Sequence, residues 1–285
     1  MSTVEVKSTR LAGGSLMPYA EAGSPEGAPV VFVHGLGDSW WTFEPLLRQL
    51  PATLHAYAPT QRGHGDADRP AEGYRPEDFA RDLLQFLDAV GIGRAVLVGA
   101  SSGGVAARMV AGSHPDRVAG LVLMGVPAAL DDKPGAASLW ESVQALRDPV
   151  PRPFVEDFLS GMVSRPVGRG FMATMTEEGL KLPAYVWQET VRGLLETDLA
   201  ATLRGILVPT LVLWGDEDPY LPRADQQRIL DTIFGSTLVV HEGSGHVLYW
   251  EQPERVVQDI AGFAGRVLPR AGAEGDGDGG ARASG

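Results

Sequence analysis

The sequence contains no cysteine, no long hydrophobic run and comparatively few basic residues. The absence of cysteine excludes disulfides, thiolate metal sites and a cysteine nucleophile. No stretch of about 18 apolar residues occurs, so no membrane-spanning helix is expected. The first residues, MSTVEVKSTRL, lack the apolar core of a signal peptide. From these absences we expect a cytoplasmic protein that does not associate with membranes.

Acidic residues outnumber basic ones, with 36 Asp and Glu against 24 Lys and Arg and a formal net charge of −12. An acidic surface repels phosphate backbones and anionic lipids, which argues against nucleic acid or a membrane surface as a partner. With 285 residues, 44% of them hydrophobic, the chain is long enough to bury a sizeable core. No sequence signal indicates a particular oligomeric state.

Short apolar runs alternate with helical patterns along much of the chain. Unbroken, β-branched runs such as PVVFVHG and AVLVG are typical of parallel strands covered on both faces. The alternation predicts an α/β fold with a mostly parallel central sheet flanked by helices. The expected strands are residues 4–11, 16–22, 29–35, 53–58, 95–99, 118–124, 209–214 and 236–241, and the expected helices are residues 76–90, 105–111 and 254–267.

The pattern changes between residues 131 and 202, where strand signals vanish and helical spacing dominates. This change predicts a helical insertion into a core domain made of residues 1–130 and 203–269. Residues 270–285 are rich in Gly, Ala and Asp and have almost no apolar mass to bury. We expect a disordered tail there.

The strongest chemical signal is the segment GASSGG, residues 99–104, directly after the apolar run AVLVG. It matches the G-x-S-x-G pattern in which a tight strand-to-helix turn lifts a serine above the sheet edge. The following helix N-terminus favours a developing negative charge. The strand phase favours Ser101 as the nucleophile, with Ser102 then giving a backbone N–H to the oxyanion. Ser102 remains the alternative, because small residues also flank it.

A second glycine-rich loop, HGLGD at residues 34–38, follows the predicted strand 29–35. Acyl transfer needs two N–H donors aimed at the oxyanion, and glycines let the backbone come close to a substrate. We assign the second donor to Leu36. His34 stands at a strand end and is interpreted as a structural histidine that bonds loop carbonyls.

A serine is a weak nucleophile at neutral pH, so a histidine must take its proton and a carboxylate must orient that histidine. His246 lies in the glycine-rich loop GSGH after the last predicted strand, and Asp218 follows the strand PTLVLW. The order Ser101, Asp218, His246 is the one expected on this type of fold. Asp216 and Glu217 are the alternative acids, which we interpret as surface or turn residues.

Taken together, these segments resemble the α/β-hydrolase superfamily, in the branch of small esterases, cofactor-free haloperoxidases, carbon–carbon bond hydrolases and epoxide hydrolases. The segments that carry the resemblance are HGLGDS, QRGHGDADRP, GASSGG, WGDEDPYLP and GSGHVLYWEQPERV, in order over about residues 15–267. The resemblance implies a catalytic triad of Ser101, Asp218 and His246, with Leu36 and Ser102 in the oxyanion hole. It also implies that residues 131–202 form a helical cap.

The chain departs from the family pattern at two places. Asp66 stands where serine usually follows the R-G-H-G loop, and Ala100 stands where histidine or glutamine often precedes the nucleophile. Epoxide hydrolases and haloalkane dehalogenases of this fold use an aspartate nucleophile. Ser101 cannot form their alkyl-ester intermediate, so both activities are disfavoured.

The sequence therefore predicts a serine hydrolase that cleaves small, largely apolar carboxylic esters through an acyl-enzyme. Few cationic residues stand near the motifs, which favours neutral substrates. Lactonase, perhydrolase and carbon–carbon hydrolase activities remain alternatives because the same triad serves each. A non-catalytic ligand sensor on the same scaffold is the alternative from another class.

No cofactor and no metal are expected. The segment from His64 to Asp68 lacks the second histidine of an H-x-H-x-D metal motif, so we interpret it as a solvated loop. The glycines of residues 270–285 are not followed by the lysine and serine or threonine of a phosphate-binding loop.

Overall fold

Eight strands form one sheet in the part of the chain that the computed structural model describes, residues 2–268. The predicted tail, residues 270–285, and the last predicted core residue, 269, lie outside these described residues. The strands are β1 (Val4–Arg10), β2 (Leu16–Gly23), β3 (Ala28–Val33), β4 (Leu54–Pro59), β5 (Ala95–Ala100), β6 (Val118–Met124), β7 (Thr210–Gly215) and β8 (Thr237–His241).

The strand order is β1-β2-β4-β3-β5-β6-β7-β8. Strands β1 and β2 pair antiparallel, as do β2 and β4, and all other neighbours are parallel. Every residue of β5, β6 and β7 is buried, as parallel strands covered on both faces require. The predicted fold class, a mostly parallel sheet flanked by helices, is confirmed.

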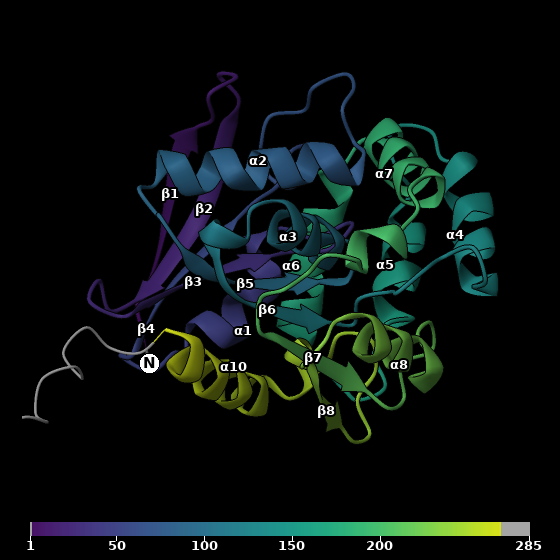
Figure 1. Ribbon diagram of the computed structural model, residues 1–285. Helices are drawn as coiled ribbons and strands as arrows, with labels where there is room; N and C mark the ends of the chain where they lie inside the picture. Colours follow the sequence, from purple (N-terminus) through teal and green to yellow (C-terminus); the bar gives the residue numbers. More distant parts are fainter. Residues whose placement is uncertain (1, 269–285) are drawn as a thin grey trace, which may run out of the picture.

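Helices cover both faces of this sheet, and α2 and α3 lie on one face while α1 and α10 lie on the other (Figure 1). None of the helices within residues 2–268 has the length and apolar character needed to cross a membrane. The helices are α1 (Glu44–Leu47), α2 (Pro76–Ala89), α3 (Ser101–Ser113), α4 (Pro134–Gln144), α5 (Arg152–Ser160), α6 (Arg169–Leu180), α7 (Ala184–Glu196), α8 (Arg223–Thr232), α9 (Leu248–Glu251) and α10 (Pro253–Val267), with short 3₁₀ turns at Trp40–Phe43, Pro115–Arg117 and Ala201–Leu203.

Helices α4 to α7 are inserted between β6 and β7, where the sequence predicts a helical insertion. Figure 1 shows α4, α5 and α7 together, on the side toward which the arrows of β6 and β7 point. Arg108, buried on α3, joins the two ends of this inserted segment. Its guanidinium donates to the Pro127 carbonyl at 2.6 Å, before the insertion, and to the Leu199 carbonyl and the Thr202 hydroxyl at 2.8 and 2.7 Å, near its end.

Candidate active site

Ser101 lies at the sharp turn between β5 and α3. Among residues 2–268 it is the one non-glycine residue with a positive φ, at +48°. A left-handed conformation is costly for a residue with a side chain and persists only where the surroundings impose it. Such strain is expected at a turn that presents a serine hydroxyl above the edge of a sheet.

Three glycines around this serine allow the turn to pack. A Cβ atom on Gly99 would lie 2.3 Å from Gly104 Cα, and one on Gly103 would lie 2.2 Å from the His34 carbonyl oxygen. On Gly104 the added atom would lie 2.2 Å from Val126 Cγ2. The small residues of the GASSGG segment are therefore needed for contact between α3 and the strands beside it.

Replacing Gly103 by alanine should destabilise the protein by roughly 2–4 kcal/mol, because the new Cβ meets backbone rather than a flexible side chain. Gly112 on the same helix is the matched control, since its Cβ would come no closer than 3.8 Å to any atom. We expect Gly112→Ala to be neutral or stabilising by up to about 1 kcal/mol. Urea unfolding of the two variants checks this, and equal stabilities would contradict the packing argument.

The structure brings Ser101, Asp218 and His246 together at the carboxyl edge of the sheet. His246 Nδ1 lies 2.8 Å from Asp218 Oδ2, and His246 Nε2 lies 3.2 Å from Ser101 Oγ. With its Nδ1 proton donated to the carboxylate, the neutral ring presents Nε2 as an acceptor for the serine hydroxyl. The three residues follow β5, β7 and β8, whose ends meet at one edge because these strands are parallel.

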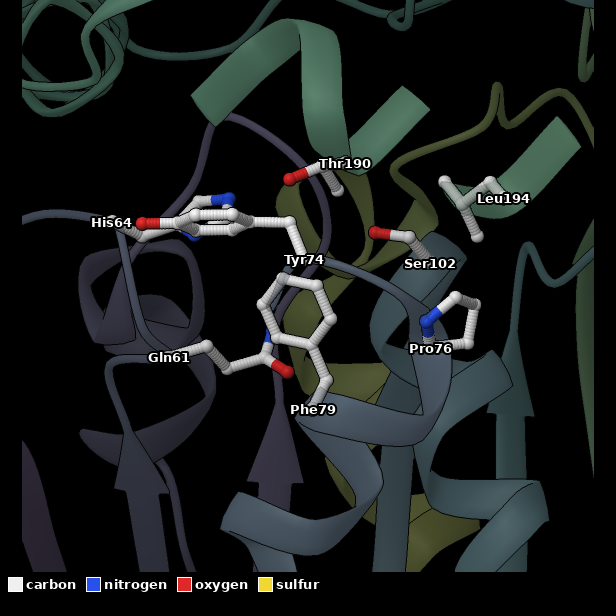
Figure 2. A pocket seen from close by; sticks show the side chains of 8 residues that line it. All are labelled: Gln61, His64, Tyr74, Pro76, Phe79, Ser102, Thr190 and Leu194. Carbon is white, nitrogen blue, oxygen red and sulfur yellow. The ribbon is translucent and has the colours of Figure 1, made fainter. Parts of the chain in front are cut away.

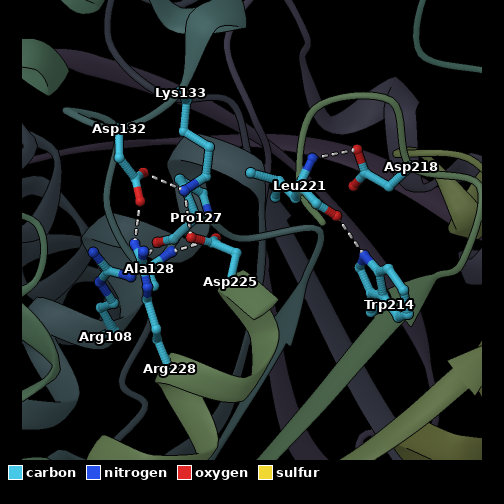
Figure 3. A network of polar contacts seen from close by, with 10 residues as sticks. All are labelled: Arg108, Pro127, Ala128, Asp132, Lys133, Trp214, Asp218, Leu221, Asp225 and Arg228. Carbon is cyan, nitrogen blue, oxygen red and sulfur yellow. Dashed lines mark hydrogen bonds and ion pairs between the residues drawn. The ribbon is translucent and has the colours of Figure 1, made fainter. Parts of the chain in front are cut away.

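Two backbone groups hold Asp218 in place. Its Oδ1 accepts the N–H groups of Tyr220 and Leu221 at 2.9 and 3.0 Å, so Oδ2 is left for His246. Figure 3 shows Leu221 between Asp218 and Trp214, whose indole N–H donates to the Leu221 carbonyl at 2.8 Å. The carboxyl group is fully buried against this loop.

The two neighbouring acids do not reach His246. Asp216 is exposed and accepts the Gly243 N–H at 2.6 Å, which fastens the loop that carries the histidine. The side chain of Glu217 is exposed. Of the three acids named from the sequence, the structure thus places Asp218 against the imidazole.

The surroundings of His246 act on its pKa in opposite directions. Burial by itself lowers this pKa, but the charge of Asp218 and its hydrogen bond, with a smaller effect of Asp38 in its ionised form, outweigh burial. The net result is a pKa above the ordinary value of a histidine. The imidazolium that forms when the ring takes a proton is therefore stabilised in this site.

A cavity of about 160 Å³ opens beside the serine and is lined by both proposed oxyanion residues, Leu36 and Ser102, together with Ser101 and His246. Within residues 2–268, neither the Leu36 nor the Ser102 N–H takes part in a turn, loop or cap hydrogen bond to a backbone carbonyl. A cavity of this size accommodates a group about as large as a benzene ring.

Ser102 differs from Ser101 in its surroundings. Its side chain lines a second, much smaller void of about 10 Å³, with Thr190 and Leu194 nearby (Figure 2). The hydrogen bond of His246 Nε2 goes to Ser101. The geometry therefore distinguishes two serines that the sequence pattern leaves as alternatives.

The larger cavity has mainly apolar walls, which come from both the core and the inserted segment; they include Leu36, Leu130, Leu139, Phe158, Met162 and Leu221. One cation, Lys133, also lines it, which the sequence did not indicate. Lys133 Nζ lies 2.5 Å from Asp225 Oδ1 and 2.6 Å from Asp132 Oδ1, so its charge is offset by two carboxylates (Figure 3). The cavity thus has no unbalanced positive charge at this wall.

His34 has the structural role that the sequence predicts. Its Nε2 accepts the Gln61 N–H at 2.9 Å, so its Nδ1 carries the proton and donates to the Gly35 carbonyl at 2.8 Å. Burial and the neighbouring His64 hold the pKa of His34 well below the usual value. The predicted solvated loop is wrong for His64, which is itself buried.

Two sequence departures from the family pattern also have a place in the structure. Asp66 is exposed and its carboxylate oxygens lie 2.9 and 3.0 Å from Lys181 on the inserted segment. Ala100 is fully buried at the end of β5. Within residues 2–268, no cluster of three or more His, Asp or Glu side chains is placed to hold a metal ion.

The sequence analysis missed one buried acid of the site. Asp38, in the loop between β3 and the turn at Trp40–Phe43, is 2% exposed and lines the cavity with Ser101 and His246. Burial raises the pKa of Asp38 to about 8. The one signal for it in the sequence is an acid placed among glycines and tryptophans, in GLGDSWW.

Comparison with known proteins gives consistent matches. Residues 28–253 match the family model described as the alpha/beta hydrolase fold. A non-heme chloroperoxidase of Streptomyces lividans is 29% identical over 270 residues, covering 88% of this chain and 96% of the relative. 3-Oxoadipate enol-lactonase 2 of Acinetobacter baylyi is 27% identical over 262 residues, covering 89% and 95%. The solved structure of a thermophilic esterase from Thermogutta terrifontis superposes with a TM-score of 0.79 at 25% identity, covering 92% of this chain and 99% of that one.

Proposed function

The chain belongs to the alpha/beta hydrolase fold family, and from that premise we propose that it is a serine hydrolase of small, largely apolar carboxylic esters. In this proposal Ser101 is the nucleophile, His246 the general base and acid, and Asp218 the carboxylate that orients the ring. The observation that carries the proposal is the continuous hydrogen-bonded series from Asp218 through His246 to Ser101 at 2.8 and 3.2 Å.

The reaction follows from this arrangement. Ser101 Oγ attacks the ester carbonyl carbon while its proton passes to His246 Nε2, and the carbonyl electron pair moves to oxygen. His246 then gives the proton to the departing alkoxide, which leaves as an alcohol and yields an acyl-Ser101 ester. Water repeats the sequence with His246 as base and releases the acid and the free serine. Asp218 keeps the imidazole in the required tautomer and stabilises the imidazolium.

The oxyanion of each tetrahedral intermediate needs hydrogen-bond donors that are in place beforehand. We assign this role to the backbone N–H groups of Leu36 and Ser102, which both border the cavity. The inserted segment, residues 131–202, acts in this proposal as a cap whose apolar side chains cover the substrate. The apolar walls and the paired charge of Lys133 support a neutral substrate.

The raised pKa of His246 predicts how hydrolysis depends on pH. Only the neutral imidazole accepts a proton, so kcat/KM should be retained at high pH and lost as the pH falls through the pKa of His246. Because that pKa is raised above the ordinary histidine value, the acidic limb should have its midpoint at a higher pH than the titration of a free imidazole. A pH profile of kcat/KM for a nitrophenyl ester checks this; a midpoint below that of a free imidazole would contradict the assigned surroundings of His246.

A substrate panel tests the reaction type. Purified protein is assayed on nitrophenyl esters of increasing acyl length, on five- and six-membered lactones, and on carboxylic acids with hydrogen peroxide. We expect hydrolysis of short acyl esters to exceed the other activities. The panel includes lactones and peroxide because relatives are named as an enol-lactonase and a chloroperoxidase. The proposal would be overturned if the protein hydrolysed none of these esters.

A further inference from the structure

Asp38 belongs to a hydrogen-bond network that the proposed mechanism does not use. Trp250 Nε1 donates to Thr42 Oγ1 at 2.8 Å, and Thr42 Oγ1 lies 3.2 Å from Asp38 Oδ2. An indole N–H is only a donor, so the threonine oxygen accepts from Trp250 and its single proton is free for Asp38. The Thr42 hydroxyl donates this proton to Asp38 Oδ2, which is thus an acceptor in this network.

The other oxygen of the carboxyl group, Asp38 Oδ1, is buried and has no hydrogen-bond partner among residues 2–268. Burial raises the pKa of Asp38 to about 8, against the opposing effects of Thr42, His246 and the Gly35 N–H. Below that pH the group is neutral, and because Oδ2 accepts from Thr42 the proton belongs on Oδ1. A buried donor without an acceptor is costly unless a ligand supplies one.

The titratable groups that face Asp38 do not supply that acceptor. They are His246, which interacts with Asp38 through its charge, and Tyr249 on α9, whose own pKa is raised far above the usual value mainly by burial and also by Asp38. Asp218 lies on the Nδ1 side of His246 and is already committed to that ring and to two backbone N–H groups. Asp38 lines the substrate cavity together with Ser101 and His246, so the acceptor for its free donor is left to a bound substrate.

Asp38 also lies close to the point where an acyl group would attach. A Cβ atom built on Gly35 would lie 3.2 Å from Ser101 Cβ and 3.6 Å from Asp38 Oδ2, so the nucleophile and the carboxyl group both lie close to Gly35. We therefore expect the part of a bound substrate near its scissile carbonyl to lie nearest this carboxyl group.

We propose that Asp38 is a substrate-binding residue that donates a hydrogen bond to an ether, hydroxyl or keto oxygen in the acyl part of the substrate, close to the scissile carbonyl. This inference rests on the proposed function and narrows its substrate class from plain alkanoyl esters to oxygen-bearing ones. In an otherwise apolar cavity, one such donor distinguishes an oxygen from a methylene group of similar size.

Two esters of equal shape test the proposal. p-Nitrophenyl methoxyacetate and p-nitrophenyl butanoate differ by one oxygen in place of one methylene group, and the ratio of their kcat/KM values is measured at pH 7 for each protein. Comparing this ratio between variants removes the intrinsic difference in reactivity of the two esters. We expect Asp38→Leu to lower the ratio about five- to tenfold, the value of one hydrogen bond.

Asp38→Asn is the matched control, because its amide oxygen can accept from Thr42 while its NH₂ group replaces the acid O–H. Its ratio should stay within about twofold of the wild type at pH 7. Between pH 7 and pH 9 the ratio should fall in the wild type, as Asp38 loses its proton, and stay constant in Asp38→Asn.

The outcomes separate the two proposals. If wild-type protein hydrolyses neither ester, the proposed function fails, and this inference with it. If both esters are hydrolysed but the ratio is the same in wild type, Asp38→Leu and Asp38→Asn, the role of Asp38 is overturned while the proposed function stands.

Discussion

Replacing Ser101 by alanine is expected to lower kcat for ester hydrolysis by about 10⁵- to 10⁶-fold. The substitution removes the oxygen that forms the acyl-enzyme, so the remaining rate comes only from binding and from the oxyanion N–H groups. The backbone turn at φ +48° becomes no more costly with alanine than with serine. Stability should therefore change little, and the loss is measurable on folded protein by steady-state kinetics.

Ser102→Ala is the matched control for this substitution. It keeps the backbone N–H that the proposal places in the oxyanion hole and removes only a hydroxyl that lines the small void (Figure 2). We expect kcat to fall by no more than about tenfold. A reversal, with Ser102→Ala inactive and Ser101→Ala active, would move the nucleophile to the neighbouring serine.

Asp218→Asn is expected to lower kcat by about 10⁴-fold. An amide in this position leaves the shape of the site unchanged, but it cannot hold the imidazole with its proton on Nδ1 or stabilise the imidazolium. Removing the carboxylate charge also removes the main force that raises the pKa of His246. The acidic limb of the residual activity should therefore move to lower pH.

Glu217→Gln controls for a general effect of removing negative charge from this loop. Its side chain is exposed, one residue before Asp218, and makes no hydrogen bond to His246. We expect kcat to change by less than about twofold, as for a surface charge in high dielectric. A loss in Glu217→Gln comparable to that in Asp218→Asn would show that the acid of the site has been misassigned.

The main features of the fold could be predicted from the sequence because buried parallel strands are continuous apolar runs. The run VAGLVLM predicts the strand of residues 118–124, and β6 spans Val118–Met124 with every residue buried. Helix α3 was predicted only over residues 105–111, yet it begins at Ser101. Glycines at its start have low helix propensity, and packing against β3 rather than propensity makes them helical.

Helix α8 was not predicted, since the segment RADQQRILDT has too few apolar residues for a helical stripe. Its buried residues include Asp225 and Gln226. Asp225 accepts the Ala128 N–H at 2.8 Å and pairs with Lys133, so polar contacts to the loop after β6 hold this helix (Figure 3). Such contacts depend on partners more than 90 residues away in sequence and leave no periodic pattern in the segment itself.

The candidate site also contains residues that the sequence identifies and residues that only the structure identifies. Motif spacing and chain order predict Ser101, Asp218 and His246 as the triad, because the nucleophile turn and the loop glycines follow from local backbone geometry, and the structure brings the three side chains together. The choice of Asp218 over Asp216 and Glu217 rests in the structure on two backbone N–H groups that fix its Oδ1. The sequence does not identify Asp38 and Lys133 as residues of the site. Their place there depends on burial and on pairing with other side chains, which only the folded chain defines.

Covalent labelling with a fluorophosphonate, followed by peptide mapping by mass spectrometry, tests the activation of Ser101 most directly. Phosphonylation requires a serine whose proton is taken by a neighbouring base, and a ligand sensor without that base would not react. The adduct is expected on Ser101 in the wild type and absent in His246→Ala. An unlabelled wild-type protein, or an adduct on Ser102 with Ser101 unmodified, would contradict the account.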